Sequence, residues 1–379
     1  MHVALLGLTH PHASPLLRTL ELLPEVSRIS LWDAANDPAS LAALPPSAKA
    51  TPATTNLDAV LAQPDLRAVV LCERHDKLAA LALQVIAAGK HLLVEKPVGL
   101  TAAEVDQVAQ AAERQGVAAS VLYVRRHHPC VLAARDRVRS GVLGAPLCIE
   151  SRFLTTQVQF RRPESWLFKR AQSGGGILLW LGCHCLDLMQ YVAGEDIVEL
   201  SAMLTTRSGA DIDVEDLAAL TLRFRSGAIG TFHAGYTLAY SGAGYVNMAG
   251  YDSYFGYNAR QGRIVWPDLE PRLYIEQPRP AGENPGQEET FPLPASAAYG
   301  GAGGEQFFRQ FFAAMEGQAT PPAPLSAAVQ TARLVEAALT SSQESRFVKI
   351  GSTASVPHMP PFAGEGYALR EVRRHLRPS

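Results

Sequence analysis

The sequence predicts an α/β protein in which an N-terminal, doubly wound parallel sheet is followed by a second domain with a large, mostly antiparallel open sheet. Over the first 120 residues, short apolar runs alternate with helical patterns, as in βαβ units. Beyond them, strand-like runs follow one another with glycines between them and few helices. The predicted domains are residues 1–124 and 125–350, and a proline- and arginine-rich extended tail follows at 351–379.

Five apolar runs are the predicted strands of the first domain: 3–8, 28–33, 67–72, 91–95 and 117–124. Ser14 and Pro15 are typical of an N-cap and first helical residue, so a helix is expected to follow the first strand. Gly89 is the expected C-cap of the helix over 77–89. Thr101 and Glu104 form a capping box for a helix that runs to Gly116. A shorter helix is expected over 57–63.

The second domain is expected to begin with a helix at 129–141 and to continue with strands at 198–207, 218–224, 227–237 and 245–251. Proline and glycine are frequent from Pro278 to Gly304, which indicates a surface loop. Two closing helices are expected at 305–317 and 327–342.

Composition favours a small-molecule partner. Lysine and arginine total 34 against 36 acidic residues, with no basic run, so neither nucleic acid nor an anionic membrane is expected to bind. Five scattered cysteines suit a reducing compartment. The N-terminus MHVALLGL lacks a basic segment and a cleavage site, and no run reaches the roughly 18 apolar residues of a membrane span. We therefore expect a cytoplasmic protein.

The loop after the first strand, GLTHPHA, has part of a dinucleotide-binding pattern. Gly7 is in the first glycine position of G-x-G-x-x-G, whereas Thr9 replaces the second. Asp33 ends the second strand, where a carboxylate can accept hydrogen bonds from both ribose hydroxyls of NAD and would repel the 2′-phosphate of NADP. An ordinary solvated acid at a strand end is the alternative interpretation of Asp33.

The two histidines of this loop allow a different hypothesis. His10 and His12 are separated by one residue, as in the first metal ligands of many (β/α)₈ hydrolases. However, Pro11 lies between them and the βα repeats stop after five strands, which argues against such a barrel. A metal-dependent hydrolase is therefore the less favoured hypothesis.

Several motifs occur in one order along the chain: AGKHLLVEKPVGLTAAE, YVRRHHP, SGVLGAP, SGGGILLWLGCHCLDLMQYVAG and DVEDLAALTLRF. Over residues 1–350 the sequence resembles the glucose-fructose oxidoreductase, inositol dehydrogenase and MocA (Gfo/Idh/MocA) family. The resemblance implies an NAD(P)-binding Rossmann domain, a C-terminal domain that supports homodimers or homotetramers, and hydride transfer between NAD and a hydroxyl or keto carbon of a sugar-like or cyclic polyol. NADP is less favoured.

The resemblance also implies site residues. Lys96 matches the lysine of the family's E-K-P motif beside the nicotinamide, and His184 matches the histidine that usually accepts the proton of the reacting hydroxyl. By position in the same pattern, the following residues are expected at the cofactor: Gly7, Leu8, Thr9, His10, Asp33, Cys72, Glu73, Arg74, Glu95 and Lys96. Candidates for substrate contact are Tyr123, Arg126, Trp166 and Trp180. Packing is the alternative role for each of these four.

Trp180 is the sharpest departure from the family, which usually has an aspartate four residues before the histidine. An indole cannot accept a hydrogen bond, so the substrate is expected to differ, and Trp180 could form a flat apolar wall. With Thr9, this change motivates the alternative of a non-catalytic or regulatory protein that binds a dinucleotide.

Cys183 and Cys185 flank His184 but cannot share a metal ion with it on a helix, where neighbours point about 100° apart. No metal site is expected. The face of the helix that matters is expected to run through Trp180, His184, Asp187 and Tyr191. Asp187 is available to hold the imidazole of His184, and a purely structural role is the alternative for it.

Overall fold

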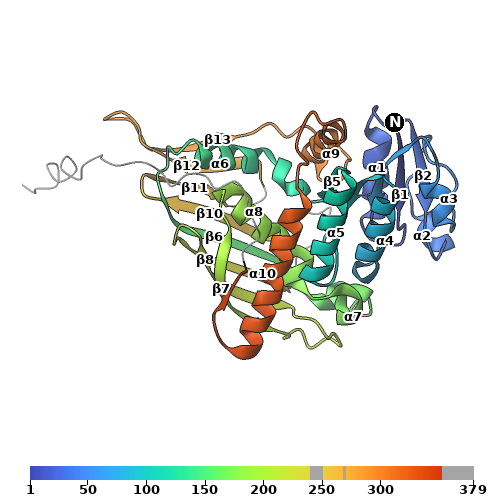
Figure 1. Ribbon diagram of the computed structural model, residues 1–379. Helices are drawn as coiled ribbons and strands as arrows, with labels where there is room; N and C mark the ends of the chain where they lie inside the picture. Colours follow the sequence, from blue (N-terminus) through green and yellow to red (C-terminus); the bar gives the residue numbers. More distant parts are fainter. Residues whose placement is uncertain (240–250, 268–269, 352–379) are drawn as a thin grey trace, which may run out of the picture.

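The computed structural model describes residues 1–239, 251–267 and 270–351. Two sheets with separate hydrophobic cores make up the molecule. In Figure 1 the N-terminal sheet lies on the right with α1, α4 and α5 around it, and the larger sheet lies on the left. The expected α/β fold with a parallel and a mostly antiparallel sheet is confirmed.

The N-terminal sheet contains β1 (His2–Leu6), β2 (Arg28–Trp32), β3 (Leu66–Leu71), β4 (His91–Val94) and β5 (Ala119–Val121). All neighbouring strands are parallel, in the order β2-β1-β3-β4-β5. The chain moves to one side of β1 to form β2 and then to the other side to form β3. The carboxyl ends of β1 and β3 therefore flank a switch point, where such sheets bind ligands.

The helices of this half are α1 (Ala13–Leu22), α2 (Pro38–Ala42), α3 (Leu57–Leu61), α4 (His75–Ala87) and α5 (Ala102–Gln115). The capping of α5 is as predicted: the Thr101 side chain accepts from the backbone of Glu104, and Gly116 ends the helix in a left-handed conformation. The predicted N-cap Ser14 is wrong. His12 is the N-cap of α1, because its carbonyl accepts the first helical hydrogen bond, from the backbone N–H of Leu16 at 3.0 Å.

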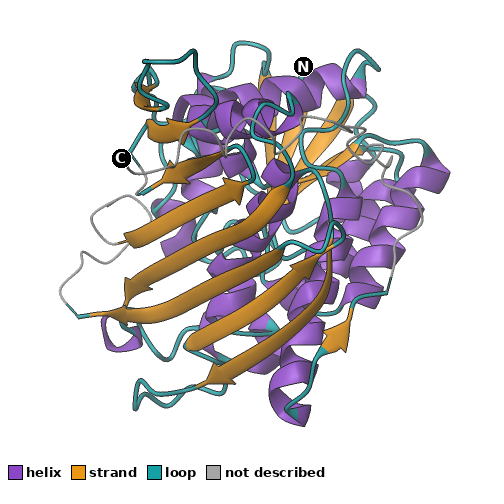
Figure 2. Ribbon diagram, turned by 90° about the vertical axis from the view of Figure 1, so that its left-hand side faces the viewer, coloured by secondary structure: helices purple, strands orange, loops and turns teal. Residues whose placement is uncertain are grey.

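The second sheet has the order β13-β12-β11-β10-β6-β9-β8-β7-β14, and only its β6–β9 pair is parallel among the described residues. Figure 2 shows one broad face of this sheet uncovered by helices. The strands are β6 (Pro146–Thr156), β7 (Ile197–Thr205), β8 (Leu217–Phe224), β9 (Ile229–Leu238), β10 (Tyr251–Ala259), β11 (Gly262–Trp266), β12 (Arg272–Glu276), β13 (Gly286–Thr290) and β14 (Val348–Lys349).

Two expectations for this half need correction. The segment 278–304, predicted as a loop, contains β13, whose residues pair with β12. Most of the strand predicted at 245–251 lies outside the described residues, and β10 begins at its last residue, Tyr251. Residues 352–379 of the predicted tail also lie outside the described part.

The remaining helical segments follow β5 along the chain. They are η1 (Val124–His127), α6 (Pro129–Arg139), η2 (Val158–Phe160), η3 (Trp166–Phe168), α7 (Arg170–Ser173), the π turn η4 (Leu178–Gly182), α8 (Cys183–Ala193), α9 (Gly301–Met315) and α10 (Leu325–Glu344). The helical segment Arg170–Ala193 is long and apolar enough for a membrane span by length and composition, contrary to the expectation from sequence. However, 89% of its most apolar window is buried inside the protein, as in a core helix.

Candidate active site

The ends of β1, β3 and β4 bring the predicted cofactor loop together. Gly7 has a φ of +87°, and a Cβ at this position would lie 2.1 Å from the carbonyl oxygen of Cys72. Only glycine fits this turn, as the first position of the dinucleotide fingerprint requires. Thr9, which replaces the second glycine, is exposed on the outside of the loop.

Asp33 is buried beside this loop and already has three backbone donors. Its carboxylate accepts from the N–H groups of Leu8 at 2.7 Å and of Ala35 and Asn36 at 2.9 Å each. A carboxylate has about four acceptor positions, so one position remains for a ribose hydroxyl. The negative charge is unfavourable for a 2′-phosphate.

His10 and His12 lie next to each other with their rings edge to face, 4.9 Å between centroids. Nδ1 of His10 accepts from the backbone N–H of His12 and lies 3.1 Å from the Sγ of Cys72. Nδ1 of His12 lies 2.8 Å from Oε1 of Glu95, so the two histidines have different partners. Among the described residues, no group of three or more histidine, cysteine or acidic side chains could hold a metal ion.

Lys96 follows β4 and is completely buried. Its ammonium donates to the carbonyl of Trp180 at 2.7 Å and lies 3.6 Å from the centroid of the Trp180 ring. Burial is the main cause that lowers the pKa of Lys96. Burial favours the neutral form of Glu95, but the neighbouring His12 and Lys96 outweigh it and hold the pKa of Glu95 below its ordinary value.

The indole of Trp180 fills the space in front of Lys96. It is stacked against the ring of His12 at 5.4 Å and that of His75 at 5.3 Å, with interplanar angles of 26° and 28°. His10 lies 5.8 Å away and Trp166 meets the indole edge to face at 6.3 Å. We call this group, His10, His12, His75, Trp166 and Trp180, the aromatic cluster.

The residues after β3 divide between the cluster and the surface. Burial raises the pKa of the Cys72 thiol well above its ordinary value, and it also raises that of Glu73. Arg74 turns toward solvent, where it forms an ion pair with Asp76. His75 joins the cluster: its Nδ1 donates to the carbonyl of Ser173 at 2.8 Å, and burial lowers its pKa to about 3.

His184 lies in the first turn of α8, with its ring 5.7 Å from the ring of Tyr123. Burial is the largest cause that lowers its pKa well below the ordinary value, and the positive charge of Lys96 acts in the same direction. Its Nδ1 is buried and has no hydrogen-bond partner within the described part of the chain. The imidazole is therefore neutral near pH 7.

Of the two roles expected for Asp187, the structure shows the structural one and no bond to His184. Its carboxylate binds Arg126 through two bonds, from Nε at 2.9 Å and from Nη2 at 2.5 Å. Both residues are buried, so Arg126 connects η1 to α8 rather than facing an open cleft. Cys183 and Cys185 are both buried.

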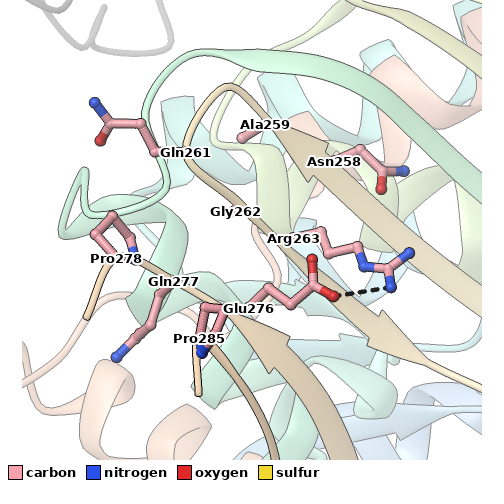
Figure 3. Close-up of a pocket in the computed structure, with 9 residues that line it drawn as sticks. All are labelled: Asn258, Ala259, Gln261, Gly262, Arg263, Glu276, Gln277, Pro278 and Pro285. Carbon is pink, nitrogen blue, oxygen red and sulfur yellow. Dashed lines mark hydrogen bonds and ion pairs between the residues drawn. The ribbon is translucent and has the colours of Figure 1, made fainter. Parts of the chain in front are cut away.

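A separate surface pocket lies between the β10–β11 hairpin and the end of β12, far from the ends of β1, β3 and β4 (Figure 3). The ion pair between Arg263 and Glu276 is on its wall. The side chains that surround Lys96 do not contribute to this pocket.

The residues at the strand ends fit NAD in one half of the site. Gly7 provides the turn, and Asp33 keeps an acceptor position for the ribose. In the other half, the indole of Trp180 occupies the space next to Lys96. A planar ring can therefore reach the Lys96 ammonium only after the indole has moved.

Sequence reasoning missed two contributors to this site. The bond between His12 and Glu95 joins residues 83 positions apart, and the hydroxyl of Tyr299 lies 3.1 Å from Nδ1 of His12. The HPH sequence was a signal for buried histidines, but it does not indicate their partners.

Comparison with known proteins gives two family matches and distant relatives. Residues 2–123 match the model described as "Oxidoreductase family, NAD-binding Rossmann fold", and residues 131–250 match "GFO/IDH/MocA C-terminal domain". The 1,5-anhydro-D-fructose reductase of Ensifer adhaerens is 27% identical over 50% of this chain and 57% of the relative. The trans-1,2-dihydrobenzene-1,2-diol dehydrogenase of Bos taurus is 30% identical over 45% of this chain and 48% of the relative. The chain thus spans about half the length of these curated relatives.

Among solved structures, levoglucosan dehydrogenase in complex with NADH and levoglucosan has a TM-score of 0.79, at 21% identity over 93% of this chain and all of that one. GenD2 from gentamicin A biosynthesis, in complex with NAD, has a TM-score of 0.74 at 24% identity, over 93% of this chain and 97% of that one. These likenesses agree with the observed fold. With both of its domains matched in order, the chain belongs to the Gfo/Idh/MocA oxidoreductase family and has that family's NAD-binding Rossmann domain.

Proposed function

We propose that the protein is an NAD-dependent oxidoreductase that transfers a hydride between nicotinamide and a hydroxyl or keto carbon of a sugar-like or cyclic polyol. The observation that carries the proposal is the buried ammonium of Lys96 at the carboxyl end of β4, on the same sheet edge as Gly7 and Asp33. When bound, the dinucleotide supplies the hydride acceptor or donor.

In this proposal, Lys96 and His184 are the polar pair of the reaction. The ammonium of Lys96 donates a hydrogen bond to the reacting oxygen and stabilises negative charge that develops on it. The neutral imidazole of His184 contacts the same oxygen. Trp180 and Trp166 offer apolar surfaces to the face of a ring-shaped substrate, and Tyr123 packs behind His184.

The names of the relatives support the substrate class. They include an anhydrofructose reductase, a levoglucosan dehydrogenase, a myo-inositol 2-dehydrogenase and a dehydrogenase of a cyclic diol. Each name refers to a small molecule that carries hydroxyl or keto groups. This chain has an indole where the family usually has an acid, so we expect a less polar substrate, such as an anhydrosugar or a cyclic diol.

Steady-state assays test the proposal. The purified protein is screened with NAD⁺ against sugars, anhydrosugars, cyclitols and cyclic diols, and with NADH against the matching ketones, by following the absorbance of NADH. We expect turnover with at least one member and a preference for NAD over NADP.

A non-catalytic dinucleotide-binding protein is the second candidate. It is favoured by the indole of Trp180, which fills the space next to Lys96. NAD binding in a calorimetric titration, without turnover on any member of the panel and without exchange of labelled hydride, would establish this second function and reject the first.

We also propose that the protein forms homodimers or homotetramers through the uncovered face of the second sheet. Exposed apolar side chains of this sheet include Met203 on β7 and Ile229 on β9, which are 80% and 53% exposed, and Phe347, just before β14, is 59% exposed. Light scattering after gel filtration tests this assembly. A monomer at micromolar concentration would contradict it.

A further inference from the structure

Glu215 is a buried acid that the proposed reaction does not use. It belongs to the DVEDL motif and lies two residues before the start of β8, with 5% of its surface exposed. An acid is rarely buried unless its carboxylate is paired or hydrogen-bonded. The partners of Glu215 therefore indicate what this acid does.

The partners of Glu215 are the first backbone N–H groups of the helical segment formed by η4 and α8. Oε1 accepts from the N–H of Gly176 at 2.8 Å and from that of Leu178 at 3.2 Å. The backbone carbonyl of Glu215 accepts from the N–H of Ile177 at 3.0 Å. The N–H groups of a first helical turn have no partner within their own helix. A single residue thus satisfies three successive donors at this helix start.

Gly176 makes this close approach possible. A Cβ at its position would lie 1.8 Å from the carbonyl oxygen of Glu215. Only glycine therefore lets the helix start reach the turn before β8. Oε2 of Glu215 lies 3.7 Å from Nη2 of Arg170, and a negative charge is favourable at the N-terminus of a helix. Steric fit, hydrogen bonds and charge all hold the same helix start.

The helix start that Glu215 holds is also the part of the helix that contacts Lys96. The backbone N–H of Trp180 donates to the carbonyl of Gly176 at 2.9 Å, so Trp180 lies one turn from the held end. The carbonyl of Trp180 in turn accepts from the ammonium of Lys96 at 2.7 Å. His184 follows in the first turn of α8. A displacement of the helix start therefore moves groups that take part in the proposed reaction.

We propose that Glu215 is a positioning residue of the active site, which sets the places of Trp180 and His184 opposite Lys96 by holding the start of their helix. The inference rests on the proposed hydride transfer. In this role Glu215 does not touch the substrate and acts only through the helix. A misplacement of reacting groups by about 1 Å can lower a rate by about 10²-fold, so the hydrogen bonds of one buried acid are enough to control turnover.

Asp216, the next residue along the chain, provides a matched control. It is also buried, and its carboxylate accepts from the backbone N–H groups of Arg207 at 2.9 Å and of Ser208 at 2.6 Å. These donors belong to the segment after β7, which carries no residue of the proposed reaction. A loss of stability alone should therefore appear in variants of both acids, whereas an effect on the reacting groups should appear only in variants of Glu215.

Kinetics with a substrate from the panel give the first readout, at a temperature well below the unfolding temperature of each variant. Glu215→Ala should lower kcat by about 10²-fold, because the helix start loses two acceptors. Glu215→Gln should keep kcat within about threefold of the unmodified protein, since its amide oxygen can accept the same two bonds. Asp216→Ala should leave kcat unchanged. A loss of kcat in Glu215→Gln or in Asp216→Ala as large as that in Glu215→Ala would overturn the assignment.

The fluorescence of Trp180 gives the second readout and needs no substrate. The indole is 2% exposed and stacked on the rings of His12 and His75. Subtracting the spectrum of the matching Trp180→Phe variant isolates its emission. Glu215→Ala should shift this emission to longer wavelengths and let acrylamide quench it, because a displaced indole meets water. Glu215→Gln and Asp216→Ala should leave it unchanged. An unchanged emission in Glu215→Ala would overturn the proposal.

The two readouts separate a failure of this inference from a failure of the proposed function. If no substrate of the panel turns over, the hydride-transfer function fails, and the emission of Trp180 still decides whether Glu215 positions the helix. If Glu215→Ala does not fold, Glu215→Asp replaces it. Its carboxylate is one methylene shorter, so it should lower kcat and shift the emission in the same directions. A Glu215→Asp protein in which either quantity is unchanged would then overturn the proposal.

Discussion

Two buried acid–base pairs lie close to the candidate site, and they differ in what they can do. Arg126 and Asp187 join η1 to α8 through two hydrogen bonds, and the guanidinium remains protonated at all relevant pH values. His12 and Glu95 join the start of α1 to the end of β4 through a single bond, and the imidazole can gain or lose a proton. The first pair therefore keeps a fixed charge, whereas the charge of an imidazole–carboxylate pair can change.

The partners of the acids explain this difference. Asp187 has both oxygens on the fork of Arg126, and the Arg126 guanidinium lies 4.5 Å from the centroid of the Tyr191 ring. Glu95 divides its oxygens between a side chain and a backbone N–H, so one of its partners can change its charge without breaking the other bond. Burial alone therefore does not indicate whether a charged pair serves structure or chemistry.

The largest expected loss of stability comes from breaking the ion pair between Arg126 and Asp187. Asp187→Ala leaves the Arg126 charge buried without its carboxylate, which should cost about 3–5 kcal/mol of unfolding free energy. Glu95→Gln should cost less, because an imidazole, unlike a guanidinium, need not remain charged. Urea unfolding monitored by circular dichroism measures both, and the double variant Arg126→Met/Asp187→Leu should recover most of the loss. Equal losses in the two single variants would refute the distinction between the pairs.

His184 is expected to affect turnover but not cofactor binding. His184→Ala removes a donor to the reacting oxygen and should lower kcat by about 10²–10³-fold, while the Kd for NAD changes by less than about threefold. Kinetics and calorimetry on the same preparation separate the two quantities. His233→Ala, at an exposed position on β9, is the matched control and should change neither. A large loss of NAD affinity in His184→Ala would contradict its placement beside the substrate.

Replacing Trp180 is expected to have a smaller effect, and one that strengthens NAD binding. Trp180→Ala removes an indole that a ligand must displace, and ring stacking is worth roughly 0.5–1.5 kcal/mol. NAD should therefore bind up to about tenfold more tightly, as measured by calorimetry. Trp266→Phe, in the second sheet, is the control and should leave the affinity unchanged. Weaker binding of NAD to Trp180→Ala would show that the indole supports the cofactor.

The sequence predicted the parts of the molecule that local rules determine. The alternation of strands and helices, the cap at Thr101 and the strand-end positions of Gly7, Asp33 and Lys96 follow from periodicity and turn chemistry. The pairing of Asp187 with Arg126 could not be predicted, because these residues are 61 positions apart and Asp187 was equally well placed for His184.

The directions of the side chains around Trp180 could not be predicted from local sequence rules either. The helix that contains it begins with the π turn Leu178–Gly182, which a helical pattern in the sequence does not indicate. The predicted face through Trp180, His184 and Asp187 therefore does not act as one surface. Trp180 packs into the aromatic cluster, His184 packs on Tyr123, and Asp187 binds Arg126.

The helix α10 belongs to both hydrophobic cores. Leu325 and Val329, near its start, pack with the N-terminal sheet, and Leu334 and Ala338 pack with the second sheet. Just before α10, the carbonyl of Ala323 accepts from the backbone of Val121 and covers the edge of β5. Melting α10 removes apolar contacts from both halves at once. We therefore expect the protein to unfold in one cooperative transition, and a fragment that ends at residue 124 to expose β5 and aggregate.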